Sequence, residues 1–486
     1  MNHPPGCMKT LHILSAIIVS LLLSGCVTAV VTPQQEAAAG SAMSQQVAEQ
    51  IGLYQDPVLA SYVEAVGQRL VASLGETPYR FQFAIVDQFE PNAFASPGGY
   101  IYVSRGLLAQ MNDEGELAGV LAHEISHVTR RHHVRQAGRA LGTGLLTLPG
   151  RAVGVVSEDL GNMINSPIEL AGEVYLSSYS RGQESEADQY GMRLASAAGY
   201  DPLSLADALE GIERSVNLLT GKEHQASYLD SHPTTPERVA SIQNLAAQLP
   251  PLTDVRVIAN HQQLQAKLDG LWWGRQNPQQ GIFRKDVFLN ADMDFTVRFP
   301  SGWQTMNTPR FVGAMEPEGN AYLALGANSG EFTPEGYAAA LITRMRDRSG
   351  LDPAVSRSFR IQDWPAHLVR YDDGSEEGVI SLFYVFLDTP GGSFTFMGMG
   401  FERLRSPLRD AVMSMRPLTA TERNSIGGLR LRLADVRPGE SLQAWSERVG
   451  SQWSADLAGA INGVDADYRG SGESLKYVRR ETYSAP

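Results

Sequence analysis

Cysteine is nearly absent from this sequence, with two residues among 486, Cys7 and Cys26. An apolar run separates them, so its removal as a signal peptide would leave Cys26 as the only cysteine of the mature chain. Such a chain cannot form an internal disulfide, even in a compartment that permits one. It also offers no free thiolate to a metal site, which leaves histidine and carboxylate side chains as ligands.

Positive charge is scarce as well. The chain carries 40 lysines and arginines against 53 acidic residues, a net charge of −13. This balance argues against a nucleic-acid partner, because nucleic-acid binding calls for a basic face. The sequence shows no internal repeats and no heptads, and its apolar run at residues 11–23 is too short to span a bilayer comfortably. The length and the 43% hydrophobic content predict a globular protein of two or three domains.

The N-terminus predicts a lipoprotein signal peptide. A basic residue precedes the apolar run, and the run ends in Leu23-Ser24-Gly25-Cys26, which resembles the lipobox of bacterial lipoproteins. Cys26 would then be the acylated first residue of the mature chain. Val27, where an aspartate would favour the inner membrane, resembles the outer-membrane sorting pattern. The alternative is a buried helix with an incidental cysteine, and the true start is Met1 or Met8.

Residues 116–130 carry the strongest chemical pattern. Their apolar residues recur at the spacing of one helix face. His123 and His127 are four residues apart, so their imidazoles point the same way, and Glu124 lies beside them. This is the H-E-x-x-H pattern of zinc metalloproteases, in which two histidines bind the metal and the glutamate reaches its water. So short a pattern also occurs by chance, so the prediction depends on what else the chain supplies.

A third ligand is expected on another helix. A catalytic zinc usually takes three protein ligands and leaves one position open. Glu184 and Asp188 are four residues apart on a helix that ends at Gly199, and Glu184 is the strongest candidate for the third ligand. Asp188 would accept a hydrogen bond from the ring N–H of a zinc-bound histidine. Alone, this pair is typical of a solvated helix face; with H-E-x-x-H it predicts one zinc per chain.

The remaining elements of the first half can be placed by their patterns. Helices are expected at 34–56, at 57–70 with Asp56 as N-cap, from Asp201-Pro202 to about 218, and at 236–247 with Thr235 as N-cap. Strands are expected at 81–86 and 100–103, with a turn at 91–99 between them. The second strand is either an open edge for an extended peptide or half of an ordinary hairpin. Residues 141–176 are either a helical hairpin or a mobile lid.

Four motifs stand in the order found in M48-type zinc metalloproteases. In chain order they are N-A-F-x-x-P-G-G at 92–99, H-E-x-x-H at 123–127, S-R-x-x-E-x-x-A-D at 180–188, and His232-Pro. Over residues 35–248 the chain resembles the periplasmic, outer-membrane-associated branch of that family. The resemblance implies that His123, His127 and Glu184 bind zinc and that Glu124 is the general base. It implies that Asp188 supports a ligand and that His232 is an active-site residue near the zinc or the oxyanion.

The second half departs from that branch, which carries helical repeats after its catalytic domain. Residues 290–420 predict an α+β domain with no catalytic constellation, because six strand patterns and two helix patterns follow one another there. Residues 429–480 resemble a LysM-type βααβ module, which in bacteria binds glycan; a purely structural domain is the alternative. The expected organisation is therefore a signal peptide (1–25), a tether (26–34), a mainly helical zincin-type domain with a small sheet (35–248), a linker (249–289) and these two domains.

The predicted chemistry is peptide hydrolysis. Glu124 takes the proton of the attacking water and passes it to the leaving amine. His232 or Arg238 supplies a donor to the oxyanion, although a packing or salt-bridge role for Arg238 is equally open. His132 and His133 are expected to be structural or surface residues rather than ligands. Trp272 and Trp273 are expected to pack in a core, with an exposed partner-binding pair as the alternative.

The predicted function is a zinc-dependent endopeptidase on the periplasmic side of the bacterial cell envelope. It would be anchored through lipidated Cys26, at the outer membrane, and act on misfolded or unassembled envelope proteins. Outer-membrane assembly machinery and peptidoglycan are the expected further partners. The alternative is an envelope scaffold or peptidoglycan-binding protein whose zinc site is latent or self-inhibited, closed by His232 or by residues 141–176.

Overall fold

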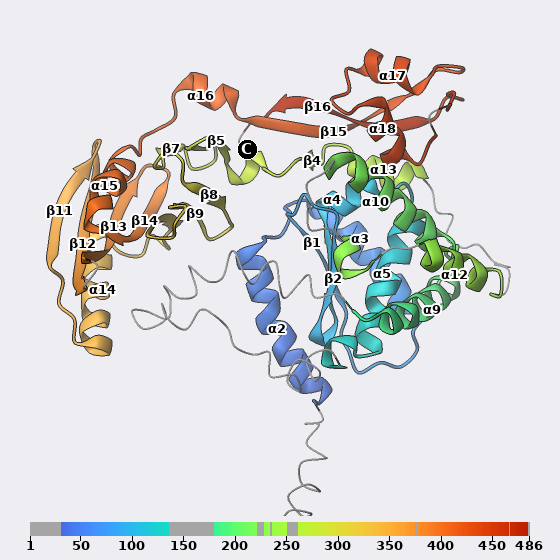
Figure 1. The fold of residues 1–486 in the computed structure, drawn as a ribbon, viewed down its shortest axis with the longest axis horizontal. Helices are drawn as coiled ribbons and strands as arrows, with labels where there is room; N and C mark the ends of the chain where they lie inside the picture. The colour runs from blue at the N-terminus through green and yellow to red at the C-terminus, as the bar shows by residue number, and fades with distance from the viewer. Residues whose placement is uncertain are drawn as a thin grey trace, which may run out of the picture.

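The structure, a computed structural model, describes residues 31–135, 179–220, 228–233, 236–249, 261–375, 378–465 and 467–484. Figure 1 shows three parts: a mainly helical region from blue to green, a yellow-to-orange region with a large sheet, and a red C-terminal unit. Cys26 and the predicted segment 141–176 lie outside the described residues. Within the described ranges no helix is long and apolar enough to cross a membrane.

The first region packs helices around a three-stranded sheet. Strand β3 is central, parallel to β1 and antiparallel to β2. The elements in chain order are α2 (Pro33–Gln50), α3 (Pro57–Val71), β1 (Gln82–Val86), β2 (Ala93–Ser96), η1 (Pro97–Gly99), β3 (Tyr100–Ser104), α4 (Arg105–Gln110), α5 (Glu114–Thr129), α9 (Arg181–Ala197), α10 (Ser204–Thr220), α11 (Tyr228–Ser231), α12 (Pro236–Ala246) and α13 (His261–Leu268).

Polar caps fix where the predicted helices begin. The Asp56 carboxylate accepts hydrogen bonds from the N–H groups of Val58 and Leu59, as expected for the N-cap of α3. Helix α9 begins with a capping box in which the side chains of Ser180 and Gln183 satisfy each other's backbone N–H groups. The predicted cap Thr235 lies outside the described residues.

The turn predicted at 91–99 is wrong for residues 93–96. Residues 93–96 form β2, and the reversal is confined to Pro97–Gly99, where Gly98 has φ 80 and Gly99 φ 104. The strand that begins at residue 100, β3, is therefore half of a hairpin with β2, as one of the two alternatives predicted, and it lies in the middle of the sheet. It is not an open edge of the sheet, because β1 and β2 flank it. The edge strand of the sheet that packs against α5 is β2.

The second region is built on a seven-stranded antiparallel sheet with the order β11-β12-β13-β14-β10-β9-β8. The predicted strands and both predicted helices are present, while β5, β6, β8 and β11 were not expected. The elements are η4 (Pro278–Gln280), β5 (Ile282–Arg284), β6 (Val287–Asn290), β7 (Phe295–Arg298), β8 (Gln304–Asn307), β9 (Phe311–Met315), β10 (Ala321–Ala327), α14 (Pro334–Ser349), β11 (Val355–Ile361), β12 (Trp364–Ser375), β13 (Gly378–Thr389), β14 (Gly392–Phe401), η5 (Glu402–Leu404) and α15 (Arg405–Met413).

The segment predicted as a linker is structured over much of its length. It contains α13, β4 (Trp272–Trp273), β5 and β6. Trp272 and Trp273 are buried, as the core interpretation expects, because β4 pairs with a strand near the C-terminus. The strand that pairs with β4 lies more than 150 residues further along the chain, so the residues around β4 carry no local pattern that predicts the pairing. This is why the sequence suggested a linker.

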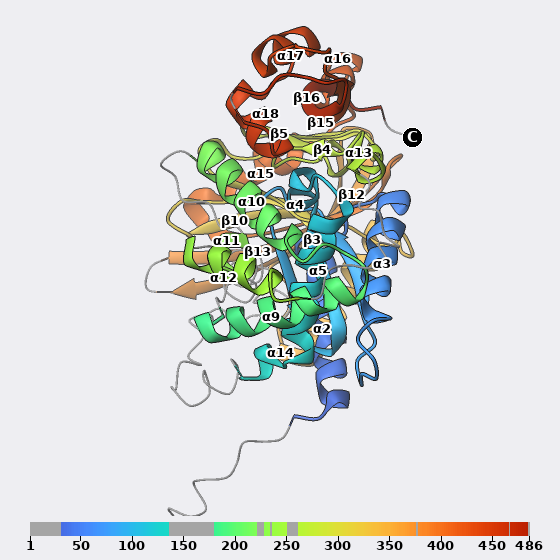
Figure 2. The same cartoon turned by 90° about the vertical axis from the view of Figure 1, so that its right-hand side faces the viewer.

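The C-terminal unit has the element order strand–helix–helix–strand. After α16 (Ala420–Ser425) come β15 (Gly427–Asp435), α17 (Leu442–Val449), α18 (Ala455–Asn462) and β16 (Ser474–Thr482), and β15 and β16 pair antiparallel. Figure 2 shows the unit seated on the first region at α10, and α18 packs against α10 and α4. Its apolar residues and those around α5 belong to one continuous core. Residues 427–482 are therefore anchored to the first region by burial.

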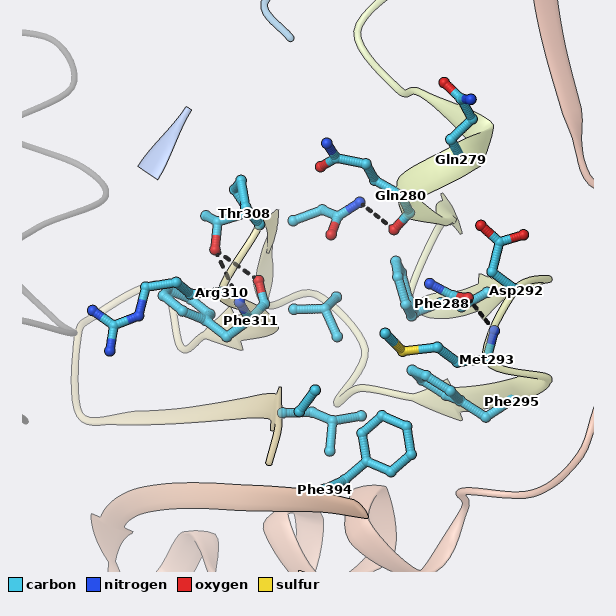
Figure 3. A pocket seen from close by; sticks show the side chains of 16 residues that line it. Gln279, Gln280, Phe288, Asp292, Met293, Phe295, Thr308, Arg310, Phe311 and Phe394 are labelled. Atoms are coloured by element: carbon cyan, nitrogen blue, oxygen red, sulfur yellow. Dashed lines mark hydrogen bonds between the residues drawn. The ribbon is translucent and has the colours of Figure 1, made fainter. Parts of the chain in front are cut away.

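A groove of about 270 Å³ lies in the second region, between the small β5-β6-β7 sheet and the large sheet, and Figure 3 shows the side chains that line it. Phe288, Phe295, Phe311 and Phe394 form its apolar part. Polar side chains, among them Asp292 and Arg310, line the rest. None of its lining residues belongs to the histidine-bearing helices, so the predicted chemistry lies elsewhere.

Candidate metal centre

Two helices and one loop bring the predicted site together. Helices α5 and α9 pack against each other, and α9 approaches closely at Gly191: a Cβ there would lie 2.9 Å from the backbone nitrogen of His123. His123 and His127 project from α5 and Glu184 from the first turn of α9. His232 follows α11 directly. All four side chains are buried.

Their donor atoms converge on one point. The ligand atoms of His123, His127, Glu184 and His232 all lie within 4.8 Å of one another. The Nε2 atoms of His123 and His127 are 2.9 Å apart, and His232 Nδ1 lies 3.2 Å from His123 Nε2. Both Glu184 oxygens lie 3.1 Å from His232 Nδ1. The structure thus assembles the three predicted ligands and adds His232 to them.

This donor set fits zinc. Two imidazoles and a carboxylate, with no thiolate, are the ligands of many catalytic zinc sites. Donors about 2.0–2.1 Å from a tetrahedral ion lie roughly 3.3 Å from one another. The observed separations among the three predicted ligands run from 2.9 Å between the histidines to 3.5 Å between His123 Nε2 and Glu184 Oε2. His123, His127, Glu184 and His232 therefore form a zinc site.

The charges around the site favour an ionised carboxylate. Burial by itself would raise the pKa of Glu184, but the electrostatic effect of the neighbouring His232 and hydrogen bonds from His123 and His232 outweigh it and hold that pKa well below its usual range. Burial likewise opposes a charge on His123. Hydrogen bonds to Asp188 and Glu184 overcome this and raise the pKa of His123 to about 9. The carboxylates of α9 at this site are therefore negatively charged, which favours the binding of a metal cation.

Asp188 lies where it was expected, behind a ligand. Its Oδ1 is 2.9 Å from His123 Nδ1, on the ring edge opposite the donor atom. Arg238 on α12 holds Asp188 with two N–H groups, at 2.9 and 2.8 Å, and contacts Glu184 Oε2 at 3.1 Å. Arg238 also donates to the backbone oxygen of His232 at 3.1 Å. These contacts give Arg238 the salt-bridge role and tie α9 to the His232 loop.

Glu124 is a buried polar group without a hydrogen-bond partner among the described residues. It is fully buried, and within the described residues neither carboxylate oxygen has a hydrogen bond. His232 Nε2 lies 3.4 Å from its Oε1. Burial raises the pKa of Glu124, and the electrostatic effects of the neighbouring His232 and His123 only partly offset this. An unpaired buried carboxylate destabilises a fold, which favours a functional reason for its presence.

Aromatic rings flank the histidines. Tyr179 stacks on His127 with ring centroids 3.9 Å apart, and Tyr228 stacks on His232 with centroids 4.5 Å apart. Neither tyrosine was singled out from the sequence. Tyr179 directly precedes the 180–188 motif and Tyr228 lies four residues before His232, so their closeness to these motifs is the signal that could have found them.

His132 and His133 are not members of the donor cluster, as predicted, but His132 is not a surface residue. It is fully buried, and its Nδ1 lies 2.9 Å from His127 Nδ1. Its Nε2 lies 3.2 Å from Glu186 Oε2 on α9. His133 points elsewhere, with Nε2 3.0 Å from the buried Glu36 of α2. The sequence interpretation missed Glu186 entirely.

Comparison with known proteins places residues 57–246 on the model of peptidase family M48. The chain is 31% identical over 225 residues to a beta-barrel assembly-enhancing protease of Yersinia pestis, which is 45% of this chain and 45% of that protein. It is 33% identical to the metalloprotease LoiP of Escherichia coli over 32% of this chain and 58% of that one. It is 28% identical to the mitochondrial metalloendopeptidase OMA1 of Schizosaccharomyces pombe over 37% and 51%. The chain thus spans about half the length of the curated relatives it matches.

Proposed function

We propose that the chain is a lipid-anchored endopeptidase of the bacterial cell envelope, on the premise that residues 57–246, which match the model of peptidase family M48 and hold the zinc site, are its metallopeptidase domain. It hydrolyses peptide bonds of misfolded or unassembled envelope proteins. The observation that carries the catalytic part is the convergence of His123, His127 and Glu184 beside the unpaired carboxylate of Glu124.

In this proposal His123, His127 and Glu184 hold the metal, and Glu124 is the general base. Zinc bound there supplies a Lewis acid for the scissile carbonyl and lowers the pKa of water. Glu124 takes one proton from the attacking water and returns it to the leaving amine as the C–N bond breaks. Asp188, whose Oδ1 lies 2.9 Å from His123 Nδ1, favours the tautomer with its proton on Nδ1 and so leaves the Nε2 atom of His123 free for the metal.

We further propose that His232 gates the site. A catalytic zinc needs a position free of protein ligands, and His232 Nδ1 completes a set of four donors. The described arrangement is then a resting form, in which a substrate carbonyl has no free position. Opening requires His232 to swing away from Glu184, and Arg238 and Tyr228 hold it in place until then.

The test uses the protein without residues 1–26, with zinc content and casein cleavage measured together. We expect one zinc per chain in the wild type, and in Glu124→Gln an unchanged zinc content with no cleavage. His232→Ala should keep zinc through its three remaining ligands and cleave casein faster than the wild type if the gate limits the rate. Cleavage by Glu124→Gln at the wild-type rate would refute the assignment of the base. Absence of zinc from the wild type would refute the site.

The envelope part of the proposal is supported by the lipobox-like ending at Cys26 and by the relatives. The first-named relative is a beta-barrel assembly-enhancing protease. The proposal predicts that full-length protein made in a bacterium fractionates with the outer membrane and labels with palmitate. Cys26→Ser should release it into the soluble periplasmic fraction. A Cys26→Ser variant that stays in the membrane would show that another feature holds it there.

The competing function is a scaffold with a latent zinc site, in which the C-terminal parts act on peptidoglycan or on assembly machinery. The βααβ order of residues 427–482 favours this candidate, because it is the order expected for a LysM-type module. Co-sedimentation of the wild-type protein with purified peptidoglycan tests it. Sedimentation together with an absence of cleavage in every variant would favour the scaffold over the enzyme.

A further inference from the structure

We propose that His132 and Glu186 are positioning residues of the zinc site, which fix the tautomer and the orientation of the ligand His127. The inference rests on the proposed function only in taking His127 as a zinc ligand. Neither residue touches the metal position. They act in sequence, Glu186 on His132 and His132 on His127.

The two nitrogens of His127 face different surroundings. Its Nε2 points at the donor cluster, 2.9 Å from His123 Nε2 and 3.4 Å from Glu184 Oε1. Its Nδ1 points away from the cluster, 2.9 Å from His132 Nδ1. A neutral imidazole carries one proton, and a nitrogen that binds a metal must be bare. The proton of His127 therefore belongs on Nδ1, where it can only be donated to His132.

His132 can accept that proton in one tautomer alone. To receive the Nδ1–H of His127, its own Nδ1 must be bare, so its proton belongs on Nε2. The Nε2 atom lies 3.2 Å from Glu186 Oε2, and a carboxylate accepts this N–H. The anion at one end thus orders both rings and leaves His127 Nε2 free for the metal. Each hydrogen bond in the series has one possible direction.

Glu186 is itself held in place. Arg130 Nε donates to its Oε1 at 2.5 Å, and Arg135 donates to Oε2 at 3.1 Å. The carboxylate is partly exposed, with a side-chain exposure of 23%, whereas His132 is fully buried. The series therefore runs from a zinc ligand inside the protein to an arginine-clamped carboxylate at its surface.

The end of α5 makes this arrangement possible. Arg131 follows the last residues of the helix with φ 54, a left-handed conformation that is common where a helix ends. Its N–H donates to Val128 O at 2.8 Å. This reversal turns the next residue back over the helix, so that the ring of His132 reaches Nδ1 of His127. Gln183 secures the reversal by donating to the backbone oxygen of His132 at 3.1 Å.

The two zinc histidines are supported in parallel. His123 reaches a carboxylate of α9 directly, through Asp188, while His127 reaches one through His132. One helix thus carries Glu184 for the metal, Asp188 behind the first histidine and Glu186 behind the second. In other zinc sites, removing a residue that hydrogen-bonds to a metal ligand weakens metal binding about 10–100-fold.

A packing role for His132 is the competing explanation, and His133 provides the control. The adjacent His133 is also largely buried and also contacts a carboxylate, that of Glu36, but it does not touch His127. If burial alone mattered, His132→Leu and His133→Leu would behave alike. A role through His127 affects metal binding for His132 only.

The experiment measures the dissociation constant for zinc by competition with a chromophoric chelator, on the protein lacking residues 1–26, together with the thermal unfolding of each metal-free variant. His132→Leu should bind zinc about 10–100-fold more weakly than the wild type. His132→Asn should regain much of the affinity, because its amide oxygen can accept near the position of Nδ1. His133→Leu should bind zinc as the wild type does. The visible absorption of bound cobalt(II) should change in His132→Leu and not in His133→Leu.

Glu186 supplies the second arm, because it lies near the surface and its replacement spares the core. Glu186→Ala should weaken zinc binding less than His132→Leu does, and Glu186→Gln, which keeps an acceptor oxygen, should restore it. An unchanged zinc constant in a folded His132→Leu variant would overturn the inference, as would equal losses in the two histidine variants. Wild-type protein that binds zinc but never cleaves would instead refute the proposed function, and the affinity comparison would stand.

Discussion

Gly191→Ala should separate the helix that carries Glu184 from the helix that carries both histidines. The added Cβ would lie 2.9 Å from the backbone nitrogen of His123, 3.0 Å from its Cα and 3.1 Å from the carbonyl carbon of Ala122. All three are main-chain atoms of α5, which cannot rotate away as a side chain can. Ordinary contact begins at 3.4 Å, so α9 must retreat by about 0.5 Å.

That displacement is large for a metal centre. Overpacking of this kind costs about 1–3 kcal/mol of stability. Ligands and catalytic groups tolerate errors of about 0.5 Å at most, and a misplacement of about 1 Å can cost 100-fold in rate. We therefore expect Gly191→Ala to bind zinc at least about 10-fold more weakly and to lose about 10–100-fold in kcat/KM for casein.

Gly182 is the matched control on the same helix. It lies at the exposed start of α9, and a Cβ there would meet nothing within 4 Å. Alanine favours a helix over glycine by about 1 kcal/mol, so Gly182→Ala should leave zinc affinity and cleavage unchanged or make the protein slightly more stable. If Gly191→Ala bound zinc and cleaved casein like the wild type, the close approach of α9 would not set the geometry of the site.

Three further predictions concern stability. Removing zinc with a chelator should lower the unfolding temperature, by an amount equivalent to about 4 kcal/mol when free zinc had been at 1,000 times its dissociation constant, and added zinc should restore it; an unchanged temperature would contradict a metal held by the fold. Trp273 is buried between Phe89 of the first region and Trp453 of the C-terminal unit, with ring centroids 5.0 Å from each. Trp273→Ala should therefore cost about 3–5 kcal/mol and make both parts unfold at lower temperature in a thermal scan, whereas two independent units would respond separately. Glu481 pairs with Arg432 at 2.6 Å, and hydrogen bonds from Arg432 outweigh burial and lower the pKa of Glu481 to about 2. Its contribution is thus complete above the unfolded pKa of 4.5 and lost as pH falls towards 2, so Glu481→Gln should destabilise at pH 7 and less so at pH 3; an equal effect at both values would show that the charge is not responsible.

Local spacing determined much of the site. His123, Glu124 and His127 could be placed from the sequence, because residues four apart on a helix project from the same face whatever surrounds them. The same rule applies to Glu184 and Asp188. Asp56 could be identified as a cap because the side chain of an N-cap bonds to N–H groups two and three residues ahead. Each of these relationships lies within a few residues of chain.

Tertiary structure determined the contacts between segments that are distant in the chain. Glu186 is two residues from Glu184, about 200° around the helix, so a sequence pattern places it on the opposite face. It reaches the site because His132 turns back at the left-handed residue after α5. The same holds for β4, whose partner β15 is far away in the chain, and for β2, whose strand conformation depends on pairing with β3.

The sequence by itself therefore determined the class of chemistry, since the ligand types and their helical spacings are local. Only the tertiary structure decided that His232 joins the donor set, that His132 links a ligand to the surface, and that the C-terminal unit shares a core with the catalytic region. The physical reason is one of range. Helix geometry relates neighbours along the chain, whereas hydrogen bonds and burial join residues that the sequence separates by tens or hundreds of positions.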